Sequence, residues 1–349
     1  MGGGSWSVGS YSARVSAAKA AGIPTFGHSA KVKAGVVRGV HKLLEPTQVA
    51  GPNSPFAGKV MREVCVTDEH PDPTAIQIWL DVTGSNISAA KVVHSKLPNL
   101  QAYLKDGNFC ADPQINIGAI GDATSDEYPL QWGQFESDNR LDDQIAAVIL
   151  EGAGGGQVHE TYELGAYMSA RHTHLEPYEL FGKKGFVFFF GDEMPYDKIR
   201  RDYGRYRWHG DNYTLKSLTG DDAAEDISAA TVFAELQQKN HVFFLFQRMG
   251  AYYPEEITPA WEELIGKENV IVLDDPAVSV EAIAALIARF EGGLDTGATK
   301  AAMLSAGGSK KSVSTALAAI ENTAPTAGGM SLARTSGSLD TKGDGADRL

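Results

Sequence analysis

Three stretches of this sequence place carboxyl or hydroxyl side chains directly after apolar runs. One run leads into DVTGS at 81–85, a second ends in GD at 121–122, and a third ends in GDE at 191–193. In an open parallel sheet, ligands bind outside the carboxyl ends of the strands. Carboxylate, hydroxyl and water oxygens are the donors that Mg²⁺ or Mn²⁺ prefers. These stretches therefore indicate a divalent metal site at one edge of a sheet.

The first stretch also fits a helix-capping turn. Thr83 or Ser85 could accept hydrogen bonds from free amides at the start of the next helix. Asp192, at the end of another expected strand, favours the metal site, because a capping turn needs no second carboxylate there. Asp122 leaves three interpretations open: it holds the neighbouring loop, binds the metal through water, or caps a turn.

The elements that must position these residues form an α/β pattern. From about Thr74 onward, short apolar runs alternate with amphipathic stretches, which is typical of a doubly wound, mostly parallel sheet of six strands. Only TSDEYP separates the second strand from the third, so these two should form an antiparallel hairpin at the sheet edge. The expected strands span 75–81, 115–122, 130–136, 185–192, 241–247 and 269–275, and the expected helices 87–104, 139–151, 161–172, 222–239, 254–265 and 278–291.

Composition excludes several classes of protein. The 349 residues are 43% hydrophobic, which rules out a wholly disordered or fibrous chain. No apolar run approaches the roughly 18 residues of a membrane span, and the first residues lack a signal-peptide pattern, so we expect neither membrane insertion nor export. Cys65 and Cys110 form no disulfide framework or zinc motif, and they suit a reducing cytoplasm.

Charge is divided unevenly along the chain. Residues 1–60 hold seven Lys or Arg against the single acid Glu45, whereas the whole chain has a net charge of −13. We expect residues 1–73 to be a basic extension, rich in Gly, Ser and Ala, that lies on the acidic body. Residues 293–349 are expected to be a low-complexity, mostly disordered tail, in which SVSTALAAIEN at 312–322 could form one short docking helix. Nucleic acid is not an expected partner, except through the basic extension.

The segment AIQIWLDVTGSN resembles the start of a von Willebrand factor A (VWA) domain, whose DxSxS or DxTxS loop opens a metal-ion-dependent adhesion site (MIDAS). GAGGGQVHETYELGAYMSA is similar to the Gly-rich loop and helix of that family, and GFVFFFGDEMP to the end of its fourth strand. The resemblance covers residues 74–292 and implies a Rossmann-like VWA fold. This sequence departs from the family pattern in three places. Thr83 stands where Ser is common, Asn86 stands where Met is common, and QVHE separates the glycines from Thr161.

The resemblance implies which residues hold the metal ion. The ion would be Mg²⁺, with Mn²⁺ or Ca²⁺ as substitutes. Asp122, Glu160 and Glu163 are expected next to the ligands, and Glu160 or Glu163 could replace Thr161. The implied ligands are two aspartates and three hydroxyl residues, namely Asp81, Thr83, Ser85, Thr161 and Asp192.

The same resemblance implies a binding module and not an enzyme. Such a module captures an acidic side chain of a partner protein, and several relatives inside cells work beside AAA+ ATPases. The segment 201–213 interleaves arginines with aromatic residues, which are common at protein interfaces. Arg205, Tyr206 and Trp208 are therefore expected to form a rim that contacts the partner.

A second family fits part of the same pattern. DVTGS also resembles the DxTGT phosphorylation loop of haloacid dehalogenase-type phosphotransferases, and GDEMPYD at 191–197 resembles their metal motif, with Lys183 or Lys184 upstream. This alternative implies an Mg²⁺-dependent phosphatase or phosphotransferase with Asp81 as the nucleophile. Thr83 stands where soluble members usually have an acid–base Asp, so the adhesion-type site is favoured.

Overall fold

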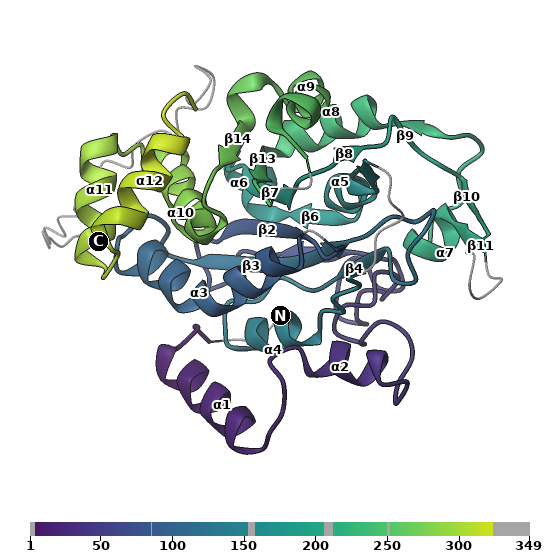
Figure 1. Ribbon diagram of the computed structural model, residues 1–349, viewed down its shortest axis with the longest axis horizontal. Helices are drawn as coiled ribbons and strands as arrows, with labels where there is room; N and C mark the ends of the chain where they lie inside the picture. The colour runs from purple at the N-terminus through teal and green to yellow at the C-terminus, as the bar shows by residue number, and fades with distance from the viewer. Residues whose placement is uncertain (1–3, 85, 153–157, 206–211, 250–251, 324–349) are drawn as a thin grey trace, which may run out of the picture.

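A computed structural model describes residues 4–84, 86–152, 158–205, 212–249 and 252–323. Its central sheet has six strands: β2 (Thr74–Asp81), β3 (Pro113–Ile120), β4 (Leu130–Trp132), β7 (Gly185–Gly191), β13 (Asn240–Gln247) and β14 (Val270–Leu273). Their order across the sheet is β14-β13-β7-β2-β3-β4 (Figure 1). Only the pairing of β3 with β4 is antiparallel among these strands. The expected mostly parallel sheet and its antiparallel edge strand are confirmed.

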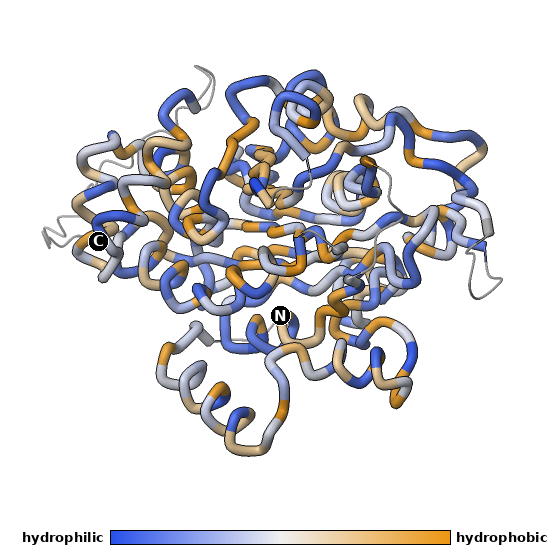
Figure 2. The backbone as a smooth tube through the Cα atoms, viewed as in Figure 1, coloured by the Kyte–Doolittle hydropathy of each residue, from blue (hydrophilic) through white to orange (hydrophobic). Residues whose placement is uncertain are grey.

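The inner strands β2, β3 and β7 are buried at every residue. Helices cover both faces of the sheet, so the residues along these strands do not alternate between buried apolar and exposed polar side chains. Figure 2 shows apolar stretches concentrated in these central strands. Neighbouring strands also fit closely, because a Cβ added to Gly118 on β3 would lie 2.1 Å from the ring of Trp79 on β2. Glycine at this position lets the indole lie across the next strand.

Two apolar clusters join the helices to the two faces of the sheet. One face carries α3 (Ile87–Lys105), α4 (Arg140–Ala147) and α10 (Ser279–Phe290), and the other carries α5 (Tyr162–Arg171), α8 (Ala229–Lys239) and α9 (Pro254–Ile265). Helices α4 and α8 are shorter than the ranges 139–151 and 222–239 expected from the sequence.

The remaining strands form short pairs around the sheet. They are β1 (Arg62–Val64) with β6 (Thr173–Leu175), β5 (His159–Glu160) with β8 (Met194–Pro195), β9 (Lys198–Ile199) with β12 (Ile227–Ser228), and β10 (Asp202–Arg205) with β11 (Asn212–Thr214). Short helices are α6 (Glu176–Phe181), α7 (Leu215–Thr219), η1 (Lys267–Asn269) and η2 (Pro276–Val278). Within the described ranges, no helix has the length and apolar character needed to cross a membrane.

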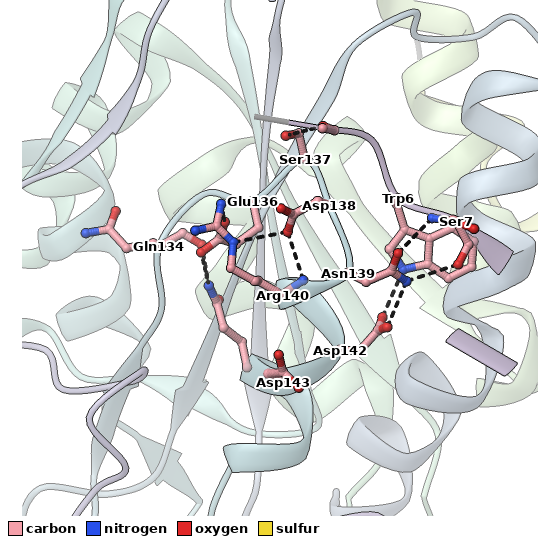
Figure 3. A network of polar contacts seen from close by, with 12 residues as sticks. Trp6, Ser7, Gln134, Glu136, Ser137, Asp138, Asn139, Arg140, Asp142 and Asp143 are labelled. Carbon is pink, nitrogen blue, oxygen red and sulfur yellow. Dashed lines mark hydrogen bonds and ion pairs between the residues drawn. The ribbon is translucent and has the colours of Figure 1, made fainter. Parts of the chain in front are cut away.

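The N-terminal segment lies against the body of the protein (Figure 1). It contains α1 (Val8–Ala20) and α2 (Gly27–Lys33). Trp6 donates from Nε1 to Asp142 at 2.9 Å, and Arg14 forms an ion pair of 2.6 Å with Asp143. Figure 3 shows Trp6 among the polar side chains around the start of α4. At this contact, basic and aromatic residues of the extension dock on acidic residues of the body.

Residues 44–62 cover the free edge of β4. The backbone N–H of Trp132 donates to the carbonyl of Leu44 at 2.7 Å. The fully buried Arg62 donates to the carbonyl of Gly133, directly after β4, and to the carbonyl of Glu45 in the covering segment. An uncovered edge strand presents free hydrogen-bonding groups to other chains. The extension therefore completes the sheet edge in addition to carrying charge.

Two helices follow the central region: α11 (Thr296–Ser305) and α12 (Lys310–Ala319). Met303, Val313 and Leu317 are buried in the cluster shared with α10. Helix α12 agrees with the one short docking helix considered at 312–322, whereas α11 was not expected in the mostly disordered tail after residue 292. A few apolar residues at helical spacing are enough to anchor helices rich in small residues. The division of the chain at 73 and 292 stays a prediction, and residues 324–349 lie outside the described part.

Candidate metal centre

Asp81 is fully buried at the carboxyl end of β2. Its Oδ1 accepts hydrogen bonds from the backbone N–H of Thr83 at 2.9 Å and from the Thr83 hydroxyl at 2.7 Å. Its Oδ2 accepts from the Tyr162 hydroxyl at 2.8 Å and from Asn86 Nδ2 at 3.2 Å. Burial raises the pKa of Asp81, whereas these hydrogen bonds favour the carboxylate and act in the opposite direction.

Asp192 follows β7, the strand that pairs with β2. The Asn86 amide donates to Asp192 as well as to Asp81, so it bridges carboxyl groups from two neighbouring strands. One oxygen each from Asp81, Asp192 and Glu193 lie within 4.8 Å of one another. Thr83 is buried beside them. The structure thus brings together three residues that the sequence assigned to the metal site: Asp81, Thr83 and Asp192.

Glu160 and Glu193 form a second carboxyl pair next to Asp81. Both are buried, and burial together with the charge of Asp81 raises the pKa of each. Among the described residues, no Lys or Arg forms an ion pair with Asp81, Glu160 or Glu193. A buried carboxylate without a partner is costly. Protons or a bound cation must therefore balance the charge of this cluster.

The oxygen donors of the cluster fit a hard divalent cation. Buried oxygens of Asn86 (Oδ1), Glu160 (Oε2) and Glu193 (Oε2) have no hydrogen-bond partner within the described part of the chain. Carboxylate, amide and hydroxyl oxygens are the ligands that Mg²⁺ and Ca²⁺ take. The residues placed to hold such an ion are Asp81, Thr83, Asp192 and Glu193.

Thr161 is buried immediately before α5, but its hydroxyl has a different partner. It donates to the carbonyl of Gly121 at 2.5 Å. The residue that reaches Asp81 from this helix is the next one, Tyr162. Thr161 therefore links the start of α5 to the end of β3. Its predicted role as a ligand stays a prediction.

Asp122 and Glu163 both contact Tyr196. The Tyr196 hydroxyl donates to Asp122 at 3.3 Å, and the Tyr196 backbone N–H donates to Glu163 Oε2 at 3.2 Å. Asp122 also accepts from the backbone N–H and hydroxyl of Thr124 at 2.8 Å. Of the three interpretations left open for Asp122, these contacts favour the one in which it holds the neighbouring loop.

Several predicted site residues are not placed. Ser85, Tyr206 and Trp208 lie outside the described residues, and of Arg205 the structure describes only the backbone, in β10. The expected partner rim therefore stays a prediction.

Three residues at the centre were not assigned to it from the sequence: Asn86, Tyr162 and Glu193. Glu193 lies inside the predicted stretch 191–193 and Asn86 directly follows the stretch 81–85, so position in the sequence was a usable signal for both. Tyr162 carried no such signal, because an aromatic residue in the first turn of a helix is usually a core residue. Only the close approach of α5 to β2 makes it a hydrogen-bond donor to Asp81.

Comparisons with known proteins find distant likenesses to solved structures. No protein-family model and no curated protein sequence matches the chain. The open conformation of the pilus adhesin SpaC from Lactobacillus rhamnosus GG is similar with a TM-score of 0.43 and 12% identity, over 66% of this chain and 31% of that chain. Proximal thread matrix protein 1 from the mussel byssus has a TM-score of 0.36 and 9% identity, over 63% and 46%. This chain spans less than half the length of either protein, and neither likeness assigns it to a family.

Glu151 is a further, half-buried carboxyl group on the rim of the centre. Its Oε1 accepts from the backbone N–H groups of Glu127 at 2.6 Å and Tyr128 at 3.3 Å. Burial raises the pKa of Glu151 to about 7. The protonated form is therefore more favoured in the folded protein than in the unfolded chain.

We expect Glu151→Gln to reduce the loss of stability that occurs as pH rises. A raised folded-state pKa gives stability that is present below the unfolded value near 4.3 and is lost as pH rises through about 7. Between pH 5 and pH 8 the free energy of unfolding should fall by about 2 kcal/mol less in the variant than in the wild type. Urea denaturation at the two pH values measures this. Exposed Glu255→Gln is the control, and equal pH dependence in all three proteins would contradict the prediction.

Proposed function

We propose that residues 74–292 form a doubly wound, VWA-like domain that binds Mg²⁺, or Mn²⁺ or Ca²⁺ in its place. In this proposal the chain is a cytoplasmic adaptor, not an enzyme, and it captures an acidic side chain of a partner protein. A bound ion would supply an open coordination position for that carboxylate. The main support is the placement of oxygens from Asp81, Asp192 and Glu193 within 4.8 Å of one another.

The sheet topology adds support for this proposal. β2 and β7 are parallel neighbours, so Asp81 and Asp192 both lie where the carboxyl ends of the strands meet. This edge is where ligands bind in open α/β sheets. The strand pair β5–β8 brings Glu160 beside the segment that follows Asp192. The carboxyl groups therefore come from separate parts of the chain, as expected for a site that the fold assembles.

The phosphotransferase alternative has less support. Such an enzyme would use a lysine close to Asp81 to bind the phosphoryl group. Lys183 forms an ion pair of 2.7 Å with Glu291, and Lys184 donates to the Gln237 carbonyl at 2.8 Å. Both lysines precede β7, so the whole strand separates them from the carboxyl edge. Both lysines therefore lie at the end of the strands opposite to Asp81 and Asp192.

We expect Asp192→Asn to weaken binding of Mn²⁺ or Mg²⁺ by roughly tenfold or more, because it removes one negative charge and keeps the shape of the side chain. Isothermal titration calorimetry with Mg²⁺, or electron paramagnetic resonance with Mn²⁺, measures this affinity. The matched control is Glu281→Gln, which also neutralises a buried carboxylate but lies in an ion pair with Lys96 on the α3–α10 contact. The control should bind metal as the wild type does.

Two results would count against the proposed function. One is a metal affinity that is the same in Asp192→Asn, Glu281→Gln and the wild type. The other is hydrolysis of p-nitrophenyl phosphate at a rate that requires Asp81, which would favour the phosphotransferase alternative.

A further inference from the structure

Most bases of the N-terminal segment are not neutralised by the acidic body. Of the seven Lys and Arg in residues 1–60, Arg14 is the one that forms an ion pair with a described residue. Lys31, Lys33 and Lys42 are exposed. The rings of His28 on α2 and His41 lie 5.0 Å apart, and this contact brings Lys42, which follows His41, toward Lys31, which lies one turn after His28 on α2. We call Lys31, Lys33 and Lys42 the basic patch.

The basic patch adjoins the candidate metal centre. A Cβ added to Gly152 would lie 3.3 Å from Lys33 Nζ, and one added to Gly84 would lie 3.8 Å from the Gly152 carbonyl oxygen. The Gly152 N–H donates to the carbonyl of Val82 at 3.3 Å. Gly152 therefore stands between Lys33 and the loop that begins at Asp81. A positive charge from the N-terminal segment reaches the rim of the centre.

α2 is held at this rim by a buried contact. The hydroxyl of Ser29 accepts from the backbone N–H of Leu150 at 3.0 Å, and Ser29 is buried. The docking contacts of α1 and the residues before it lie elsewhere: Trp6, shown in Figure 3, contacts Asp142, and Arg14 pairs with Asp143 of α4. The nearby Glu151 is engaged by the amides of residues 127 and 128 and forms no ion pair with Lys33 within the described residues. The basic patch is thus positioned by packing and keeps its charge available.

The charge of the surrounding protein limits what the basic patch can bind. Residues 61–292 hold 18 Lys or Arg against 38 Asp or Glu. A long nucleic acid would have to cross this acidic surface, where its phosphates are repelled. A short acidic segment of a protein needs only the patch and the adjoining centre. Charge complementarity therefore favours an acidic peptide.

We propose that the basic patch and the candidate metal centre form one recognition surface for a run of acidic residues in a partner protein. This inference rests on the proposed function, in which one carboxylate is captured through the metal ion. It adds that carboxylates next to that residue contact Lys33, Lys31 and Lys42. The partner is then recognised by several successive acidic residues and not by a single one.

The test uses the full chain and a fluorescein-labelled peptide of ten glutamates in buffer with Mg²⁺. The patch variant is Lys31→Glu/Lys33→Glu/Lys42→Glu. The control, Lys267→Glu/Lys310→Glu/Lys311→Glu, changes the net charge equally at exposed bases on η1 and α12. Fluorescence anisotropy should show a loss of affinity of roughly tenfold or more in the patch variant and at most about threefold in the control, because close contacts outweigh the general field. Added NaCl should weaken binding by the wild type.

The outcomes separate this inference from the function on which it rests. Equal losses in the two triple variants, or no peptide binding by the wild type, overturn the recognition surface, even if Mg²⁺ binding needs Asp192. Peptide binding that depends on the basic patch but survives EDTA supports the surface and counts against capture through a metal. A 20-nucleotide single-stranded DNA that binds more tightly than the peptide, and loses affinity only in the patch variant, overturns the acidic peptide as partner.

Discussion

Replacing Arg62 by methionine is expected to lower the free energy of unfolding by about 3 kcal/mol or more. The side chain is fully buried, and burial lowers its pKa to about 10, so the guanidinium keeps its charge at neutral pH. It donates to the carbonyls of Gly133 at 2.9 Å, Gln48 at 2.8 Å and Glu45 at 2.9 Å, and its Cζ lies 4.4 Å from the centre of the Trp132 ring. Methionine would fill the space but leave these carbonyls without a donor.

Urea denaturation of Arg62→Met and of a matched control measures this effect. The control is Arg248→Met, since Arg248 is 42% exposed and pairs with Asp274, which is 77% exposed. Exposed ion pairs contribute about 1 kcal/mol or less. Arg62→Lys should also destabilise the protein, because an ammonium group has three donors against the five of a guanidinium. If Arg62→Met costs no more than Arg248→Met, the buried guanidinium does not join the extension to β4.

The sheet could be predicted from the sequence because its strands are buried on both faces. Continuous apolar runs such as GFVFFFG at 185–191 have few alternative structures. The six-residue join between the second and third strands also leaves no room for a crossover helix, which fixes the antiparallel edge. Residues 148–151 were wrongly included in a helix. Their apolar residues pack against the sheet and the extension, and apolar content alone does not distinguish that packing from a helical turn.

The charge of the N-terminal segment predicted that it lies on the acidic body, but its covering of β4 could not be predicted from composition. Gly, Ser and Pro breaks exclude an independent core, but they do not exclude packing on a neighbouring one. Arg62, Leu44 and Phe26 owe their burial to residues far along the chain, at 94 and at 132–133. Such contacts have no periodicity in the sequence. The same holds for α11, whose Met303 is buried in the cluster shared with α10.

Part of the candidate metal centre could be predicted because strand ends are local features. Asp81 and Asp192 each directly follow an apolar run, and the parallel sheet brings them to one edge. The positions of Tyr162 and Glu160 depend instead on how α5 and β5 approach the sheet. Packing sets the distance between α5 and the sheet, and Gly191 on β7 lies in close contact with Tyr162 on α5.

Gly191→Ala is expected to cost about 3 kcal/mol of stability, because it overpacks a buried position next to the centre. A Cβ at Gly191 would lie 1.7 Å from the Tyr162 hydroxyl oxygen and 2.6 Å from its Cζ. That hydroxyl donates to Asp81 at 2.8 Å. The ring must therefore move, or β7 must shift away from α5. Either change removes a hydrogen bond from Asp81.

The double variant Gly191→Ala/Tyr162→Phe tests whether this contact is the cause. Removing the hydroxyl relieves the shortest contact, so the double variant should be more stable than the sum of the two single effects by about 1 kcal/mol or more. The control pair is Gly51→Ala with Tyr162→Phe, because a Cβ at Gly51 would meet no atom within 4 Å and the two effects should add. Additive effects of Gly191→Ala and Tyr162→Phe would mean that β7 and α5 are not in such close contact. The hydroxyl of Tyr162 would then have no fixed position over Asp81, and the carboxyl groups at the ends of β2 and β7 would not be held at the spacing that a single cation requires.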